Sequence, residues 1–386
     1  MYHIVVGVPS YNTAATVCYV VKQAALGLER HFPGERGLIL VSDGGSQDGT
    51  PEVVEALKLS VDKVVERYPG PPGKGSAIRH IMAKALEYGA EGIVLVDSDL
   101  RSITPEWIKL LGQAARGRYD LITPLYHRSK YDGMITKHLA YPLTRALYGR
   151  RVRQPIGGDF GVSARLAEKL LEEPWAGYTY RYGIDIFITS IALATGARVA
   201  QADLGSKLHD MKDPLKHLEG MFTDVSGSLF TVASRHVDKW WSISGSTEVE
   251  LLEGGAMLRC TQPAPVDLKQ GIARFKRALA GYASRSVLKE LYTEVQEAAR
   301  RLAGGEADSF PSTLWARVVY RHLAAYARRR SEGVLRSLYA CWLGKVAAFI
   351  ADTAELSDRE AELEVQREAE CFESEKEYLK QVWGEA

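Results

Sequence analysis

The stretch Gly92-Ile93-Val94-Leu95-Val96-Asp97-Ser98-Asp99 decides the fold. Its continuous aliphatic run is typical of a parallel strand that is covered on both faces. Asp97 and Asp99 follow directly, at the carboxyl end of this strand, where open α/β sheets bind their ligands. Paired carboxylates are oxygen ligands of the kind that Mg²⁺ or Mn²⁺ takes. Because an isolated Asp-x-Asp is also common in ordinary acidic turns, the neighbouring loops must decide between these two interpretations.

Composition limits the classes of protein to which the chain can belong. Its 386 residues predict about two domains, and 46% hydrophobic and 25% charged residues are ordinary for a soluble globular protein. The net charge of +1 provides no bulk field that would draw nucleic acid or an anionic membrane. We therefore expect no nucleic-acid partner. A local basic pocket is still compatible with this net charge.

Cysteines and apolar runs predict a cytoplasmic location. The cysteines at 18, 260, 341 and 371 have no metal-site spacing, which argues against a zinc site or a disulfide framework. The amino terminus lacks the pattern of a signal peptide. Ile186 to Ala194 is the longest mostly apolar stretch that we identify, and it is too short to cross a bilayer. We expect no membrane span.

Strands and helices alternate along the first half of the chain. Buried-strand runs are expected at 4–8, 37–41, 61–65, 92–96 and 119–124, with a last strand at 199–204. Helices are expected at 13–30, 76–88, 105–116 and 136–148, and Thr50 is expected to cap another with Pro51 at its first position. This alternation predicts an α/β fold with a mostly parallel, doubly wound sheet flanked by helices.

From about residue 214 the pattern is helical. Long amphipathic runs near 266–303, 312–351 and 354–383 predict an α-helical carboxyl-terminal region. We expect a catalytic domain at 1–235 and a helical region at 236–386. The helices could serve only as a scaffold, or they could pack on a second subunit and form a homo-oligomer.

Four loops carry the motifs of a recognisable family. The first strand ends in Pro-Ser-Tyr-Asn (9–12), the second in Asp-Gly-Gly-Ser-Gln-Asp-Gly-Thr (43–50), and Gly-Lys-Gly (73–75) and Asp-Ser-Asp (97–99) follow. This order resembles the family 2-type nucleotide-sugar glycosyltransferases of the GT-A fold. It does not fit a Walker A loop, which needs Gly-Lys-Ser/Thr, or a dinucleotide dehydrogenase, which needs GxGxxG after the first strand.

The resemblance implies roles for particular residues. Donor base and ribose would lie against Pro9, Tyr11 and Asp43, and the diphosphate near Lys74. A divalent ion, Mg²⁺ or Mn²⁺, would be held by Asp99, with Asp97 facing the ribose or a metal-bound water. From the residues alone, Asp43 is equally suited to an Asx-turn between strand and helix, and the Gly-Pro run at 69–75 to a flexible connector around Lys74.

The second half of the chain narrows the family. Arg128 to Thr136 precedes Gln154-Pro155-Ile156-Gly157-Gly158-Asp159, and then come Tyr182-Gly183-Ile184-Asp185 and His209. This succession, which spans roughly 4–230, resembles mannosylglycerate synthase and, more distantly, glucosyl-3-phosphoglycerate synthase. The resemblance implies that the sugar and the acceptor's carboxylate are held by Arg128, Asp132 and Thr136, with Ile156 and Gly157 in the substrate site. Asp185 would lie near the reacting centre, and His209 would be the third protein ligand of the metal.

Some of these residues have ordinary structural alternatives. Arg128 and Lys130 could be solvated loop charges, and His209 an ordinary surface histidine. Asp185 lies within an apolar helix pattern, where a carboxylate is costly to bury without a partner, which favours a functional role. Lys212, Lys216 and His217 depart from the mannosylglycerate pattern and leave open a phosphorylated acceptor.

The resemblance implies a metal-dependent, retaining glycosyltransferase. It would move mannose or glucose from a GDP- or UDP-hexose to the 2-hydroxyl of D-glycerate or 3-phosphoglycerate and so make a compatible solute. One alternative is an inverting family 2-type transferase for polysaccharide or glycolipid synthesis, although neither membrane helices nor an (E/Q)D motif is evident. The other is a non-catalytic nucleotide-sugar-binding scaffold, which would not need Asp97, Asp99, Asp185 and His209 together.

Overall fold

The computed structural model describes residues 1–208, 218–254 and 264–385. The chain forms two compact units, and each draws on three separate segments. Unit 1 consists of Met1–Arg128, Val152–Asp210 and Glu248–Thr261, and unit 2 of Ser129–Arg151, Met211–Thr247 and Gln262–Ala386. The domain boundary expected near residue 235 stays a prediction.

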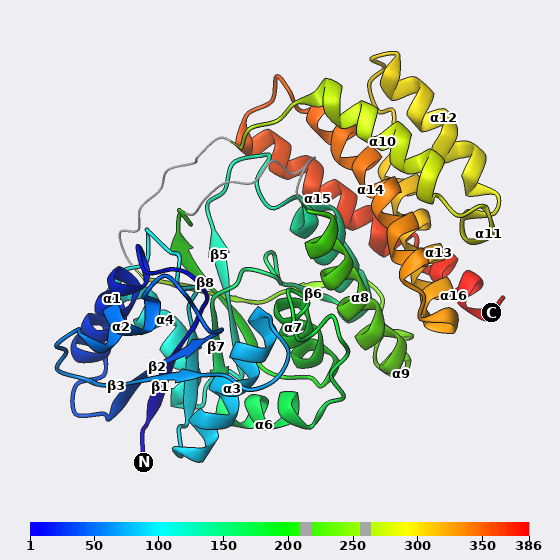
Figure 1. Cartoon of the computed structure of the whole chain (residues 1–386). Helices are drawn as coiled ribbons and strands as arrows, with labels where there is room; N and C mark the ends of the chain where they lie inside the picture. The colour runs from blue at the N-terminus through cyan, green and yellow to red at the C-terminus, as the bar shows by residue number, and fades with distance from the viewer. Residues whose placement is uncertain (209–217, 255–263, 386) are drawn as a thin grey trace. The chain divides into compact units, whose positions relative to one another are not determined.

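Unit 1 is built on an eight-stranded sheet in the order β10-β8-β5-β7-β4-β1-β2-β3, with helices against it (Figure 1). All neighbours pair in parallel except β7, which is antiparallel to β4 and β5. The α/β class with a mostly parallel sheet is therefore confirmed. The strands are β1 (Ile4–Ser10), β2 (Gly37–Asp43), β3 (Asp62–Arg67), β4 (Gly92–Leu95), β5 (Leu121–Tyr126), β7 (Phe160–Ser163), β8 (Val199–Gly205) and β10 (Glu250–Glu253).

Register brings the predicted loops to one edge of this sheet. Ser10 at the end of β1 pairs with Asp43 at the end of β2. Gly7 of β1 pairs with Leu95 of β4, so the strand that leads to Asp97 ends at the same edge. Because β7 runs the other way, the residue before its first strand position, Asp159, also reaches this edge. The sheet thus collects acidic side chains from distant parts of the sequence at its carboxyl edge.

Two short strands correct the expectation from sequence. The run at 199–204 was expected to be the last strand, but β10 pairs in parallel with β8 and forms the sheet's outer edge. The helical pattern from about 214 is likewise interrupted by β9 (Thr247–Glu248) and β10. β10 has the sequence Glu-Leu-Leu-Glu and is mostly exposed, so it carries no buried apolar run that would indicate a strand.

The helices of unit 1 cover the apolar faces of the sheet. On one face, side chains of β1, β2 and β4 pack with α1 and α4 in a core in which Val6, Val94 and Trp107 are fully buried. Close packing is needed near Gly92, where a Cβ atom would lie 2.6 Å from that of Ala115. The helices are α1 (Val17–His31), α2 (Thr50–Glu55), α3 (Lys74–Glu87), α4 (Pro105–Leu111), a 3₁₀ turn η1 (Gly112–Arg116), α6 (Ala164–Glu172) and α7 (Ile184–Ala194).

Unit 2 is predominantly helical, as predicted for the carboxyl-terminal region. A π-helix, η2 (Thr136–Ala140), leads into α5 (Tyr141–Tyr148), which packs against α15. The two-residue strands β6 (Arg150–Arg151) and β9 pair with each other. The other helices are α8 (Glu219–Arg235), α9 (Val237–Trp240), α10 (Leu268–Tyr282), α11 (Arg285–Leu288), α12 (Leu291–Ala303), α13 (Ser312–Arg329), α14 (Glu332–Asp352), α15 (Asp358–Ser374) and α16 (Lys376–Gly384).

Buried polar contacts join the segments of unit 2. In the first of them His138 serves as a hydrogen-bond partner, because burial lowers the pKa of its imidazole and so favours the neutral form. His138 of η2 and Glu368 of α15 are 3.0 Å apart, with side chains 0% and 2% exposed. Lys345 of α14 lies 3.0 Å from the same carboxylate. Arg145 of α5 contacts Glu373 of α15 at 2.6 Å. Since a buried charge is costly without a partner, these pairs fix how the inserted segment 129–151 packs on the terminal helices.

One described helix, α14, is long and apolar enough to cross a membrane, and 89% of its most apolar window is buried inside the protein. The longest apolar stretch is therefore in α14 and not at 186–194 as expected from sequence. Such a helix is weak evidence for a span, because the core helix of a globular unit has the same composition.

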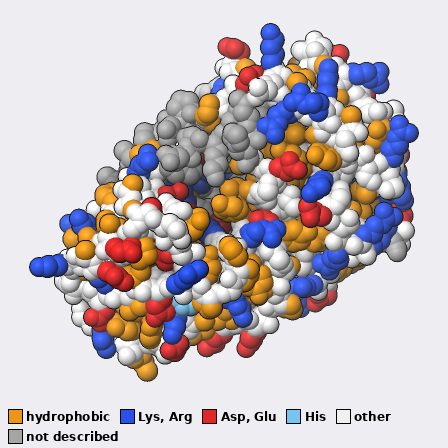
Figure 2. Space-filling view, viewed as in Figure 1, with side chains coloured by type: hydrophobic (Ala, Val, Ile, Leu, Met, Phe, Trp, Pro, Cys, Tyr) orange, Lys and Arg blue, Asp and Glu red, His pale blue; other side chains and the backbone are white. Residues whose placement is uncertain are grey.

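On the visible face, Lys and Arg side chains gather over the carboxyl-terminal helices (Figure 2), and α10 carries four basic and no acidic residues.

Candidate active site

The loop after β2 is organised by Asp43. Its carboxylate accepts hydrogen bonds from the backbone N–H groups of Gly45 and Ser46, both at 2.8 Å, and from the hydroxyls of Ser46 and Ser10 at 2.6 and 3.0 Å. The side chain is buried. In this arrangement Asp43 has the Asx-turn role, because its acceptor capacity is used by its own loop and by Ser10 at the end of β1. Its predicted contact with the donor stays a prediction and requires one of the two hydroxyls to turn away.

Lys74 is held at the start of α3, which corrects the expectation of a flexible connector. A Cβ atom on Gly75 would lie 1.9 Å from the carbonyl oxygen of Thr179, and one on Gly73 would lie 2.3 Å from that of Tyr180. Gly75 N–H also donates to the carbonyl of Arg181 at 3.2 Å. The two glycines therefore allow the backbone at the start of α3 to approach the backbone of residues 179–181 closely. This packing fixes the position of Lys74, which lies between the two glycines.

The ammonium of Lys74 joins two predicted site residues. Its Nζ atom lies 2.7 Å from Asp97 Oδ1 and 3.4 Å from Asp185 Oδ1. Burial alone would lower the pKa of Lys74, but Asp185 and Asp97 raise it overall. Burial raises the pKa of Asp185, and Lys74 offsets only part of this effect. Lys74 is therefore a permanent positive charge at the carboxyl edge of the sheet, fit to meet a phosphate.

A second lysine completes the cluster, and the sequence did not indicate it. Lys207 follows β8, and its Nζ atom lies 2.8 Å from Asp97 Oδ2 and 2.8 Å from Asp159 Oδ2. Asp159 also accepts hydrogen bonds from the Asp97 backbone N–H at 2.8 Å and from the Tyr126 hydroxyl. Burial raises the pKa of Asp97, but Lys207 and Lys74 lower it well below its usual range. Asp97 is therefore a carboxylate with one lysine on each oxygen.

Asp99 is the carboxylate of this cluster that remains available. Within the described residues it has no ion pair or hydrogen bond, and its side chain reaches solvent. Its pKa is raised by partial removal of water in the loop and then by the charge of Asp97. When all four are ionised, Asp97, Asp99, Asp159 and Asp185 outnumber the cations around them, Lys74, Lys207 and Arg128, which gives a formal excess of negative charge. Such an excess favours binding of a cation.

These residues fit a divalent cation of the Mg²⁺ type. Mg²⁺ and Mn²⁺ are commonly held by one or two carboxylates, with waters and substrate phosphates as the remaining ligands. Asp99 offers such a carboxylate. No group of three or more His, Cys, Asp or Glu residues within 1–208, 218–254 and 264–385 is arranged to hold a metal. The third predicted ligand, His209, lies outside the described residues, as do Lys212, Lys216 and His217.

Other predicted residues of unit 1 lie along the same edge. Tyr11 is 63% exposed beside Gly44, where a Cβ atom would lie 3.1 Å from its ring. Pro9 pairs with Ser42 across β1 and β2. The turn at Ile156, Gly157 and Gly158 adjoins the lysine cluster, since Gly157 accepts a hydrogen bond from Lys207 at 3.0 Å. The guanidinium of Arg128 lies 5.2 Å from the centre of the Tyr126 ring.

Asp132 and Thr136 belong to unit 2, where their segment is fixed on the terminal helices. Lys130 Nζ donates to the carbonyls of Thr353, Ala354 and Leu356 at 2.8, 2.8 and 2.7 Å, at the end of α14. Its backbone N–H donates to Asp358 at 2.8 Å. Lys130 is therefore a helix-capping residue and not a solvated loop charge. Thr136 begins η2, and the roles predicted for it and for Asp132 stay predictions.

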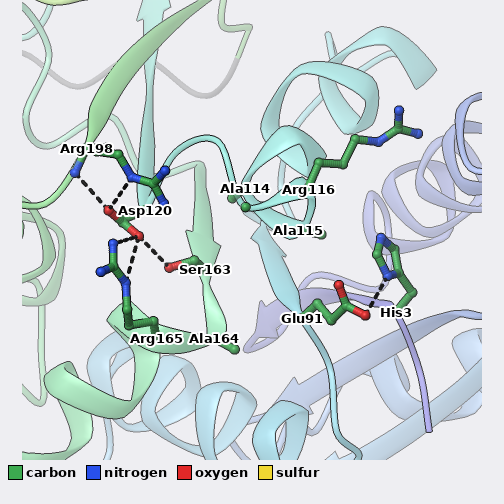
Figure 3. A pocket seen from close by; sticks show the side chains of 11 residues that line it. His3, Glu91, Ala114, Ala115, Arg116, Asp120, Ser163, Ala164, Arg165 and Arg198 are labelled. Carbon is green, nitrogen blue, oxygen red and sulfur yellow. Dashed lines mark hydrogen bonds and ion pairs between the residues drawn. The ribbon is translucent and has the colours of Figure 1, made fainter.

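A hollow of about 320 Å³ lies at the opposite, amino edge of the sheet (Figure 3). Arg165 and Arg198 converge there on the buried Asp120, at 2.5 and 3.4 Å. Ser163 donates to the same carboxylate at 3.4 Å. These contacts join the beginnings of β5, β8 and α6, and they lower the pKa of Asp120 to about 2 although burial opposes this. The charged residues of this hollow hold the ends of strands and a helix together and so have a structural role. We therefore place the candidate active site at the carboxyl edge.

The lysine and carboxylate cluster lies in a segment with a recognisable family signature. Residues 57–230 match the family described as mannosylglycerate synthase, GT domain. The predicted resemblance is confirmed. The match includes Lys74, Asp97, Asp159, Asp185 and Lys207, whereas the helices from α9 onward lie outside it.

Individual relatives agree with the mannosylglycerate synthase match. The chain is 23% identical over 300 residues to mannosylglycerate synthase of Selaginella moellendorffii, covering 71% of this chain and 65% of that protein. It is 26% identical over 190 residues to mannosylglycerate synthase of Rhodothermus marinus, covering 46% and 47%. Glucosyl-3-phosphoglycerate synthase of Petrotoga mobilis is 27% identical over 233 residues, covering 55% and 66%. The chain thus spans less than two thirds of these relatives.

A solved structure, that of glucosyl-3-phosphoglycerate synthase from Mycobacterium tuberculosis with Mn²⁺, UDP and glucosyl-3-phosphoglycerate, is also similar. It is 28% identical with a TM-score of 0.48, and the match covers 60% of this chain and 80% of that one. The same enzyme has been solved with Mg²⁺ and UDP, at 27% identity, a TM-score of 0.48 and coverage of 60% and 79%.

Proposed function

We propose that this protein is a metal-dependent, retaining glycosyltransferase. It transfers mannose or glucose from a nucleoside-diphosphate sugar to the 2-hydroxyl of D-glycerate or 3-phosphoglycerate. The observation that carries the proposal is the arrangement of four residues at the carboxyl edge of the sheet, within the segment 57–230 that matches the mannosylglycerate synthase GT domain: Lys74, Asp97, Asp99 and Asp185. The relatives named above supply the substrate class, since they are named for mannosyl and glucosyl transfer to a glycerate.

The charges of the cluster suit a diphosphate leaving group. Lys74 stays protonated at working pH, because Asp185 and Asp97 raise its pKa. It therefore presents a fixed positive charge to the phosphates before the reaction begins, and preorganised charge of this kind is an effective form of transition-state stabilisation. A bound Mg²⁺ or Mn²⁺, with Asp99 as a ligand, would neutralise the developing charge on the departing diphosphate. The four carboxylates outnumber Lys74, Lys207 and Arg128, so the cluster can accept that additional positive charge.

Arg128 is the residue that we assign to the acceptor. A guanidinium binds a carboxylate through two parallel hydrogen bonds, which fixes both the position and the orientation of a small acid. The ring of Tyr126, 5.2 Å from the guanidinium carbon, holds the side chain of Arg128 to one direction. Holding the acid in this way would place its 2-hydroxyl against the sugar carbon, which replaces an encounter in solution by a positioned attack. The acceptor roles expected for Asp132 and Thr136 stay predictions.

Same-face attack accounts for retention in this proposal. The carboxylate expected near the reacting centre, Asp185, lies 3.4 Å from Lys74, and this positive charge stabilises the carboxylate and makes it a weaker nucleophile. The acceptor hydroxyl would then attack from the side that the diphosphate leaves, and the departing phosphate oxygen would take its proton. No covalent sugar–protein intermediate is needed.

A product assay tests the proposed function. The full chain is incubated with GDP-mannose, UDP-glucose or GDP-glucose against D-glycerate and 3-phosphoglycerate, with Mg²⁺ or Mn²⁺, and the products are identified by mass spectrometry and NMR. We expect one donor to give an α-linked product at the 2-hydroxyl, and excess chelator to abolish it. Failure of all six combinations would refute the proposal, and a β-linked product would refute retention.

A further inference from the structure

Lys207 is a buried lysine, and lysine side chains are rarely buried unless they are paired. It is the second residue after β8, and its side chain is 5% exposed. Burial of an ammonium group costs several kcal/mol unless charged partners and hydrogen bonds compensate for it. Its three N–H donors have three acceptors: Asp97 Oδ2 at 2.8 Å, Asp159 Oδ2 at 2.8 Å and the carbonyl of Gly157 at 3.0 Å. The ammonium group is therefore fully satisfied and cannot turn without losing a bond.

These contacts connect two parts of the site that are far apart in sequence. Asp159 is itself anchored, because it accepts from the Asp97 backbone N–H and from Tyr126. Lys207 thus ties the side chain of Asp97 to an immobile, fully buried carboxylate. With Oδ2 held in this way, Oδ1 of Asp97 faces Lys74 at 2.7 Å. The position of the diphosphate-binding charge therefore depends on a residue that does not touch it.

The backbone leaves little room for another group at this point. Gly158 has a φ of +92°, and a Cβ atom on it would lie 2.6 Å from Asp97 Oδ2, 2.9 Å from Lys207 Nζ and 3.3 Å from Lys74 Nζ. The turn of Gly157 and Gly158 is therefore packed directly against the two ammonium groups. A planar guanidinium, which is larger than an ammonium, could not replace Lys207 without displacing this turn.

We propose that Lys207 is a positioning residue of the donor site, which holds Asp97 so that Lys74 is presented to the diphosphate of the donor. This inference rests on the proposed function. It predicts that loss of Lys207 impairs the use of the donor and leaves the affinity for the acceptor unchanged. Because Lys207 acts through Asp97, replacing its charge partner Asp159 cannot compensate for it in catalysis.

Two variants separate positioning from simple charge balance. Lys207→Met leaves Asp159 as a buried, poorly compensated charge, so it should lower both stability and kcat. In Lys207→Met/Asp159→Asn the amide still accepts from the Asp97 backbone N–H and donates to Tyr126, and no buried carboxylate is left uncompensated. We expect the double variant to regain the unfolding midpoint of the single variant Asp159→Asn. Its kcat should stay at least about ten-fold below that of Asp159→Asn, with the KM for the acceptor within about two-fold.

A matched control removes a buried lysine elsewhere. Lys376 is 5% exposed in unit 2, and its Nζ atom donates to the backbone carbonyls of Ala146 and Leu147. Lys376→Met should lower the unfolding midpoint without changing kcat for the folded fraction. Lys207→Arg should not restore kcat. If Lys207→Met, or the double variant relative to Asp159→Asn, kept full kcat, the positioning role would be overturned.

A binding measurement distinguishes failure of this inference from failure of the proposed function. Calorimetric titration of wild type and Lys207→Met with UDP and GDP, and with uridine and guanosine, needs no turnover. We expect the loss of affinity to be at least about five-fold for the diphosphate and less than two-fold for the nucleoside. Equal losses for both would overturn the inference even if the wild type transfers a hexose. If the wild type gives no product but the diphosphate-specific loss is observed, the proposed function fails and the positioning role stands.

Discussion

Adding one methyl group to Gly75 should move Lys74 out of the active site. In the structure the new Cβ atom would lie 1.9 Å from the carbonyl oxygen of Thr179 and 2.8 Å from two backbone atoms of Tyr180. Ordinary contacts of a Cβ atom are 3.4–4 Å, so the start of α3 and this backbone must separate by more than 1 Å. Neither partner is the end of a flexible side chain, so the separation cannot be absorbed by a rotamer change.

The cost follows from the contacts that this separation breaks. Two hydrogen bonds cross the interface, from Gly75 N–H to Arg181 and from Ser76 N–H to Tyr180, at 3.2 and 3.1 Å. Their loss costs about 0.5–1.5 kcal/mol each, and overpacking adds about 1–3 kcal/mol. The higher helix propensity of alanine returns less than about 1 kcal/mol. Gly75→Ala should therefore lower the free energy of unfolding by about 1–6 kcal/mol, measured by urea denaturation.

Activity should fall further than stability explains. A displacement of about 1 Å at a positioned group can cost about 100-fold in rate, and Lys74 moves with the helix start. We therefore expect kcat to fall by roughly that factor at a temperature where the variant is still folded. Gly177→Ala is the control, because a Cβ atom there has nothing within 4 Å, and it should change stability by less than about 0.5 kcal/mol. Wild-type stability and kcat in Gly75→Ala would refute the close approach of these backbones.

Three further outcomes are expected. Lys74→Ala should weaken binding of UDP or GDP in calorimetry and leave binding of the free nucleoside nearly unchanged; equal losses would show that the lysine is not at the phosphates. The pKa of Asp120 is about 2 in the folded protein, below its usual 3.8, so its ion pairs stabilise the fold above pH 4 and this contribution is lost as the pH falls toward 2. Asp120→Asn should therefore lower the free energy of unfolding by about 1–2 kcal/mol at pH 7 and flatten its dependence on pH. Parallel pH curves for the wild type and the variant would contradict the ion pairs. Glu368→Ala leaves the buried Lys345 ammonium without its carboxylate and should cost about 3–5 kcal/mol in urea unfolding. The half-exposed Glu364→Ala should cost less than about 1 kcal/mol, and similar losses in both variants would refute the buried pair.

The sheet could be predicted because its strands carry strong local signals. β1, β2 and β4 are continuous aliphatic runs that end in polar loops, and parallel pairing then brings those loops to one edge. β4 is equally short, but β7 (Phe-Gly-Val-Ser) and β10 (Glu-Leu-Leu-Glu) escaped prediction because neither carries a continuous aliphatic run. Such short segments gain their strand conformation from neighbouring strands and not from their own sequence.

Within the site, the residues that belong to sequence motifs could be predicted, whereas a residue that only the fold brings to the site could not. Asp97, Lys74 and Asp185 were found from motifs, and the structure brings their charges together. Lys207 has no motif of its own, because its carboxylate partners lie 110 and 48 residues before it in the chain. The glycines beside Lys74 fit a flexible loop and a close backbone contact equally well by sequence, because glycine occurs in both. Sequence alone does not distinguish these two uses.

The interleaving of the two units bears on how the chain folds as it is synthesised. Unit 1 needs β10, at 250–253, to complete its sheet, and in unit 2 His138 meets Glu368 only after a further 230 residues have been made. Contacts so distant in sequence are slow to form, and the surfaces that await them stay exposed meanwhile. The nascent chain should therefore carry η2 and α8, whose apolar residues are buried in the finished protein, without their cover until late in translation. Demand for chaperones during synthesis would be the consequence of this order of segments.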